Sequence, residues 1–63
     1  MTPEQAVELV GRWPQDRTVP KKLRSACDKA RGLERQQIGM LVEALMTAST
    51  EAADYDLITR YFP

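Results

Sequence analysis

The fold of this chain is decided by residues 38–48, Ile38-Gly39-Met40-Leu41-Val42-Glu43-Ala44-Leu45-Met46-Thr47-Ala48. Read as a helix, this stretch spreads its apolar side chains over roughly 160°, whereas a helix that packs on one side needs only about 100°. The side chains on this arc are Ile38, Leu41, Val42, Leu45, Met46 and Ala48. Because so wide an arc must be covered from two sides, we expect a helix from residue 33 or 34 to residue 48 at the centre of the fold.

Three shorter helices are predicted around this one. The first begins at the capping pattern Thr2-Pro3-Glu4-Gln5 and ends before Pro14. The second begins near residues 18–20 and runs to about Arg31, since Gly32 offers the left-handed conformation that is common after a helix. The last helix follows the capping segment Ser49-Thr50-Glu51.

Each of these helices has an apolar stripe at helical spacing. The stripes are Ala6, Leu9, Val10 and Trp13 in the first helix, Leu23, Ala26, Cys27 and Ala30 in the second, and Ala53, Leu57, Ile58, Tyr61 and Phe62 in the last. No segment alternates apolar and polar residues over a useful length, so no sheet is expected. We therefore predict an all-α fold, a compact bundle of four short helices around a central third helix, in a single domain of residues 1–63.

Length and composition limit the class of protein. A chain of 63 residues fits one domain with a modest core. Its lone cysteine cannot form a disulfide within the chain, which suits a reducing compartment. No basic and then apolar signal segment opens the sequence, and the longest strictly apolar run, Met40-Leu41-Val42, is far shorter than the ~20 residues of a membrane span. We expect a cytoplasmic protein that does not associate with membranes.

Catalytic and metal chemistry lack their usual residues. The chain has no histidine, so its serines and threonines have no imidazole base, and zinc and haem have no imidazole ligand. Asp54 and Asp56 are two residues apart on a helix and point to different faces. Cys27 has Arg24 and Arg31 one turn away on either side, but it lies on an apolar stripe, which favours a buried thiol. We predict no enzyme, no metal and no cofactor.

Charge is distributed unevenly along the chain although the formal net charge is zero. Residues 12–35 hold eight basic and three acidic side chains, a net charge of +5. Residues 36–63 hold four acidic side chains and one arginine, a net charge of −3. A basic segment of this kind is able to dock an anion.

Nucleic-acid binding is one candidate function for the basic segment. Residues 23–38 show part of the rhythm of a helix-turn-helix, with Gly32 at the turn and Ile38 on the second helix. The candidate contacts are Arg35, Gln36 and Gln37 to base edges, and Lys22, Arg24, Lys29 and Arg31 to phosphates. Against this interpretation, Asp28 occupies a position where a small residue usually packs, and the basic side chains flank the apolar stripe on both sides.

Binding to another protein is the other candidate function. Met40 lies roughly opposite the apolar arc of its helix, and the neighbouring Gly39 costs about 1 kcal/mol relative to alanine in a helix interior. Such a glycine often marks a close backbone approach, here either by the first helix with Trp13 or by a second chain. The end of the last helix is more apolar than a three-turn helix can bury alone. The candidate protein-binding residues are Gly39, Met40, Ile58, Tyr61 and Phe62.

The surplus of apolar surface predicts a symmetric homodimer. Nucleic-acid binders of this size are usually strongly basic, whereas this chain is neutral. We therefore predict a small non-catalytic binding or regulatory module that acts through protein–protein contacts, and nucleic-acid binding through residues 12–35 remains the alternative.

Overall fold

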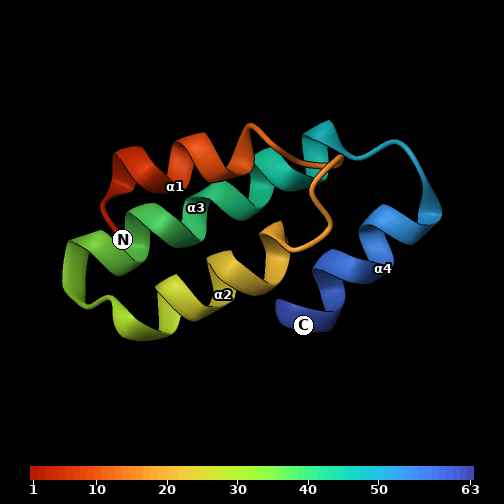
Figure 1. The fold of residues 1–63 in the computed structure, drawn as a ribbon. Helices are drawn as coiled ribbons and strands as arrows, with labels where there is room; N and C mark the ends of the chain where they lie inside the picture. The colour runs from red at the N-terminus through yellow and green to blue at the C-terminus, as the bar shows by residue number, and fades with distance from the viewer.

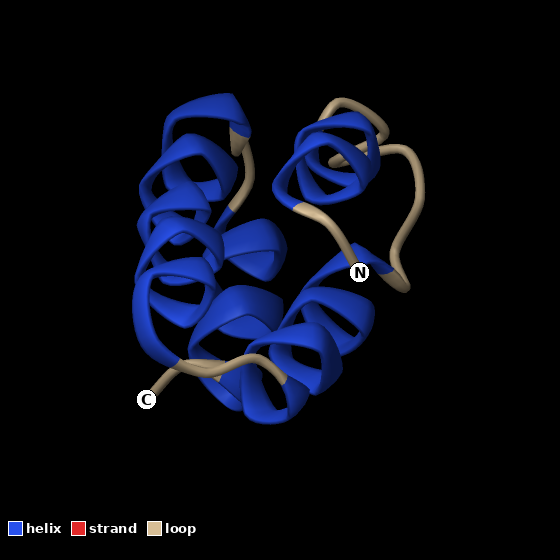
Figure 2. Cartoon of the chain, turned by 90° about the vertical axis from the view of Figure 1, so that its left-hand side faces the viewer, coloured by secondary structure: helices blue, strands red, loops and turns tan.

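The computed structural model describes all 63 residues, which form four helices joined by short connections (Figure 1). The helices are α1 (Pro3–Val10), α2 (Val19–Lys29), α3 (Gly32–Ala48) and α4 (Ala52–Tyr61). Figure 2 shows helices and loops only, with no strand. The third helix packs against the other three, whereas α1 and α4 do not pack against each other. The prediction of an all-α bundle around a central third helix is confirmed.

The predicted capping segments begin two of the helices. At α1, the backbone N–H of Gln5 donates to Thr2 Oγ1 at 3.2 Å, and the backbone N–H of Thr2 donates to Gln5 Oε1 at 3.0 Å. At α4 the cap is Glu51, which forms a reciprocal capping box with Asp54. Both boxes satisfy backbone donors that have no partner inside the helix.

Gly32 adopts the expected left-handed conformation, with φ of +60°. It lies at the start of α3, however, and not directly after the last residue of α2. The second helix ends two residues before the expected boundary, because Ala30 and Arg31 are already extended. Gly32 then opens α3. The connection between α2 and α3 is therefore a tight one of two residues.

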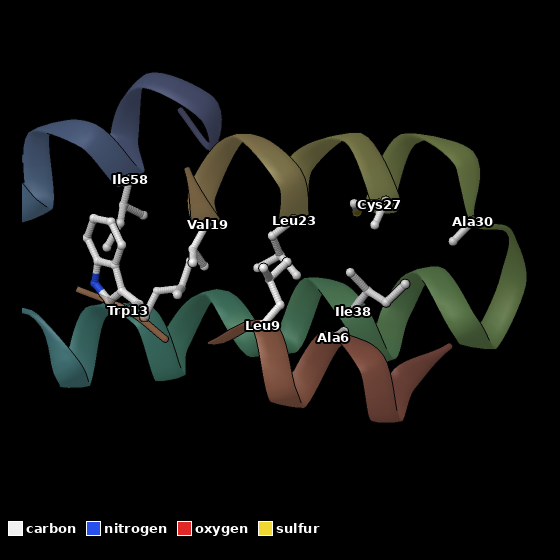
Figure 3. Close-up of a cluster of buried hydrophobic side chains, with 11 residues drawn as sticks. Ala6, Leu9, Trp13, Val19, Leu23, Cys27, Ala30, Ile38 and Ile58 are labelled. Carbon is white, nitrogen blue, oxygen red and sulfur yellow. The ribbon is translucent and has the colours of Figure 1, made fainter. Parts of the chain in front are cut away.

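The core lies between α1, α2 and α3, and α4 closes one end of it (Figure 3). Its eleven buried residues are Ala6, Leu9, Trp13, Val19, Leu23, Ala26, Cys27, Ala30, Ile38, Leu45 and Ile58. The predicted stripe of α2 is buried over its whole length, and Cys27 is a buried thiol as expected. The third helix contributes only Ile38 and Leu45 to the buried set, while Leu41 and Val42 are half-buried.

The inward face of α4 differs from the predicted one. Ala53 is exposed, and the next residue, Asp54, takes the inward position with only 3% of its surface accessible. Asp54 lies one turn before Ile58, so the two side chains face the same way. An inward carboxylate is stable here because the guanidinium of Arg17 pairs with it.

Candidate interaction surfaces

The outer face of α3 is the most exposed apolar region of a helix in this molecule. Met40 and Leu33 have 67% and 68% of their surface accessible. They lie on the side of α3 opposite Ile38 and Leu45, because a residue two positions from Ile38 is rotated by about 200° around the helix. We define the outer face by the exposed residues that follow one another at steps of three and four, Leu33, Gln36, Gln37, Met40, Glu43, Ala44 and Thr47.

Glu43 is the only charged side chain of this outer face. A solvated helix face usually carries lysine, arginine, glutamate or aspartate. The exposed face of α2 is of that ordinary kind, since it carries Lys21, Lys22, Asp28 and Lys29. With one charged side chain among seven, the outer face of α3 is closer in composition to an interface than the exposed face of α2 is.

Gly39 has open space on its side-chain side. A Cβ atom built at this residue meets no atom of another element within 4 Å. The interpretation that Gly39 makes room for α1 and Trp13 is therefore wrong, because no atom of either lies where a side chain at this position would be.

The other candidate protein-binding residues do not join Met40 in one surface. Ile58 is fully buried in the core, which corrects the expectation that it belongs to a binding face. Tyr61 and Phe62 are half-buried at the end of α4. The ring of Phe62 lies 5.8 Å from the guanidinium carbon of Arg24 on α2, so this end of α4 is already covered by its own domain.

The basic residues of α2 lie in two different environments. Lys22 and Lys29 are exposed two turns apart on one face, with Ser25 between them, and they border an open hollow that is also lined by Met1 and Ala26. Neither lysine has a carboxylate within 4 Å. Arg24, in contrast, pairs with Asp28 at 3.2 Å and is half-buried beside Phe62.

The start of α3 presents the remaining candidate nucleic-acid contacts. Arg31, Arg35, Gln36 and Gln37 are all exposed. However, α2 and α3 run side by side in opposite directions (Figure 1), and two residues join them. A helix-turn-helix has a turn of three or four residues between helices that cross at a steep angle. The pair is better described as a helical hairpin.

A polar cluster that the sequence did not predict joins the α1–α2 connection to the α3–α4 corner. The indole N–H of Trp13 donates to Ser49 Oγ at 3.0 Å, and Ser49 Oγ donates to the carbonyl of Leu45 at 2.7 Å. The guanidinium of Arg17 pairs with Asp54 and lies 4.7 Å from the centre of the Trp13 ring. The contact between Trp13 and Ser49 spans 36 residues of sequence, and the contact between Arg17 and Asp54 spans 37.

The carboxylate of Asp54 is held in its charged form by this cluster. The hydrogen bond from Arg17 and the backbone N–H groups of Thr50 and Glu51 keep the pKa of Asp54 below its ordinary value of 3.8. No buried polar side-chain atom lacks a partner in this structure. A cluster whose donors and acceptors are all satisfied has a structural role. The sequence indicates it only indirectly, because a buried tryptophan and an inward aspartate each need a hydrogen-bond partner.

Comparison with protein-family models, with curated proteins and with solved structures finds no match for this chain. None of its helices combines the length and the apolar character that crossing a membrane requires. Two surfaces of the molecule are candidates for function, the outer face of α3 and the exposed face of α2 that carries Lys22 and Lys29.

Proposed function

We propose that this chain is a non-catalytic binding module that associates with a polypeptide through the outer face of α3. The observation that carries the proposal is the exposure of Leu33 and Met40 on a helix face whose only charged side chain is Glu43. Interface cores are depleted of charged residues and enriched in methionine, whose flexible thioether adapts to a partner.

The rest of the surface offers less to a protein partner. Val7 is the other strongly exposed aliphatic residue within a helix, and it lies between Ala6 and the charged Glu8 on α1. Isolated exposed apolar residues of this kind are normal on a protein surface. Leu33 and Met40 are instead two turns apart on one face, so a helix or groove of a partner can contact both at once.

A photo-crosslinking experiment tests this proposal. The residue p-benzoylphenylalanine is placed at position 40, or at position 21 on the exposed face of α2 as the matched control, and the variants are irradiated in cells of the native host. We expect adducts with a polypeptide, either another protein or a second copy of this chain, from position 40 only. No adduct at position 40, or equal yields at both positions, contradicts the proposal.

Binding to a nucleic-acid backbone is the second candidate function. It is favoured by one observation, the pair of exposed lysines at positions 22 and 29 that border a hollow and have no carboxylate partner. Phosphate groups are bound by lysines in this way, without sequence specificity. Two lysines and a neutral chain supply a weaker field than nucleic-acid binders of this size usually have.

A further inference from the structure

The exposed face of α2 contains an open hollow of about 310 Å³. It is bordered by Met1, Lys22, Ser25, Ala26 and Lys29. Lys22 and Lys29 are two turns apart on one face, about 10 Å along the helix axis and only about 20° around it. Ser25 and Ala26 lie between them at steps of three and four, so the four residues of α2 face the same hollow.

Within this chain the two lysines have no counter-charge, since neither ammonium group has a carboxylate within 4 Å. The acid next to Lys29 in the sequence, Asp28, is paired with Arg24. The hydrogen bonds from Thr18 lower the pKa of Asp16, and the charge of Lys22 acts on that carboxylate only from beyond 4 Å. Two like charges that border one hollow repel each other, and an anion placed between them removes this repulsion.

The donors around the hollow suit a phosphate group. An ammonium group binds phosphate as a point charge, whereas the planar fork of arginine is the better match for a carboxylate. Ser25 adds a hydroxyl donor between the two ammonium groups. A phosphate monoester has three terminal oxygens, one for each of these donors. We propose that the hollow between Lys22 and Lys29 binds the phosphate group of a small organic phosphate monoester.

The size and lining of the hollow favour a small ligand over a nucleic acid. Its volume is at the lower end of the range of about 300–1,000 Å³ that small-molecule sites occupy, and Met1 and Ala26 offer apolar contacts to the organic group. A nucleic-acid backbone instead needs a row of cations that follows successive phosphates, and only two unpaired lysines border the hollow. The site lies on α2 and goes beyond the proposed function, which uses the outer face of α3.

The first test is a titration of the full chain with phenyl phosphate, followed by NMR of the backbone amides. We expect saturable shifts at the α2 residues that border the hollow, with a dissociation constant on the order of 1 mM, because each exposed ion pair contributes little. Phenol, which lacks the phosphate, is expected to give no saturable shift at these residues. Dimethyl phosphate, a diester like the units of a nucleic-acid backbone, is expected to bind at least about threefold more weakly, because it lacks one charge and one terminal oxygen.

The second test compares two double variants that remove the same charge. Lys22→Gln/Lys29→Gln is expected to weaken the binding of phenyl phosphate about tenfold, because both ammonium groups are lost. The matched control Lys21→Gln/Arg31→Gln, at exposed positions that do not border the hollow, is expected to weaken it by less than about twofold, since distant exposed charges are screened by salt. All four side chains are exposed, and circular dichroism checks that both variants stay helical.

Three results would overturn the site. The first is the absence of saturable shifts, and the second is equal weakening in both double variants, which would mean that the anion binds adventitiously to any basic surface. The third is binding of dimethyl phosphate as tight as that of phenyl phosphate, which would favour a nucleic-acid backbone instead. Photo-adducts from position 40 do not depend on Lys22 or Lys29, so this site and the proposed function can fail separately.

Discussion

Asp54 is the residue whose environment differs most from its expected one. A carboxylate at the start of a helix is ordinarily stabilised by the helix dipole while facing water. Here the side chain faces the core, accepts hydrogen bonds from Thr50 and Glu51, and pairs with Arg17 from the opposite connection. It thus serves both as part of a helix cap and as a tie between two connections that are distant in sequence.

The first prediction concerns the pH dependence of stability. Because the pKa of Asp54 is lowered in the folded state, its contribution is fully present above its ordinary value of 3.8 and is lost as the pH falls through the folded value. Urea unfolding between about pH 6 and about pH 2 should therefore show a loss of stability below about pH 4 that is smaller in Asp54→Asn. Asp56→Asn, at an exposed position of the same helix, is the control and should keep the wild-type slope.

Asp16 contributes to the same loss of stability at low pH, because the hydroxyl and the backbone N–H of Thr18 donate hydrogen bonds to its carboxylate and lower its pKa. Asp54→Asn should therefore reduce the slope without removing it. An unchanged slope in Asp54→Asn would show that the contact with Arg17 is absent in solution.

At the scale of single elements, α3 combines two kinds of glycine. Gly32 has a positive φ, which an L-residue adopts only at a cost of about 1–2 kcal/mol. Gly39 is in a regular helix interior with open space around it. One glycine is needed for the shape of the connection, whereas the other only weakens the helix.

The second prediction is that alanine has opposite effects at these two sites. Gly39→Ala should stabilise the fold by about 0.5–1 kcal/mol, because alanine restricts the unfolded chain and favours the helix. Gly32→Ala should destabilise it by about 1 kcal/mol or more. Urea denaturation at neutral pH measures both. Destabilisation by Gly39→Ala would mean that a second backbone does approach this side of α3.

The third prediction concerns the inward face of α3. Leu45 is fully buried, so Leu45→Ala should cost about 2–5 kcal/mol, which approaches the whole stability of a domain this small. Leu41 is half-buried, so Leu41→Ala should lower the free energy of unfolding by clearly less, under about 2 kcal/mol. From the sequence alone the two leucines are expected to be equivalent. Equal losses in thermal or urea unfolding would place Leu41 in the core after all.

At the scale of the whole molecule, the two candidate functions use different faces of one hairpin. The outer face of α3 has one charged side chain, Glu43, and the outer face of α2 carries the unpaired lysines. Binding of a protein partner and binding of a nucleic acid should therefore be affected by different substitutions. The two candidate functions can thus be separated without unfolding the chain.

The fourth prediction is that the chain has no strong affinity for nucleic acid. Fluorescence anisotropy with a random DNA duplex at about 50 mM salt should give no complex tighter than about 1 µM, because few phosphates can be neutralised. A tighter complex that weakens steeply with salt would instead establish the second candidate function. In that case the double variant Lys22→Gln/Lys29→Gln should flatten the salt slope, and Arg24→Gln should not, since Arg24 is already paired with Asp28.

The sequence by itself determined the helices, their order and the caps that begin α1 and α4. These features depend on residues close together in the chain: the Thr2–Gln5 capping box, the apolar stripe of α2 and the wide apolar arc of α3. Helical spacing and capping act over one or two turns, so the local sequence is sufficient to predict them.

Only the tertiary structure decided which apolar and polar residues are exposed. Met40 and Ile58 belong to equally apolar stretches, yet one is largely accessible and the other fully buried. The rotation of α4 that buries Asp54 in place of Ala53 depends on Arg17, which lies 37 residues earlier in the chain. Burial results from the packing of helices that are distant in sequence, and a buried charge is stable only where a partner from another element reaches it.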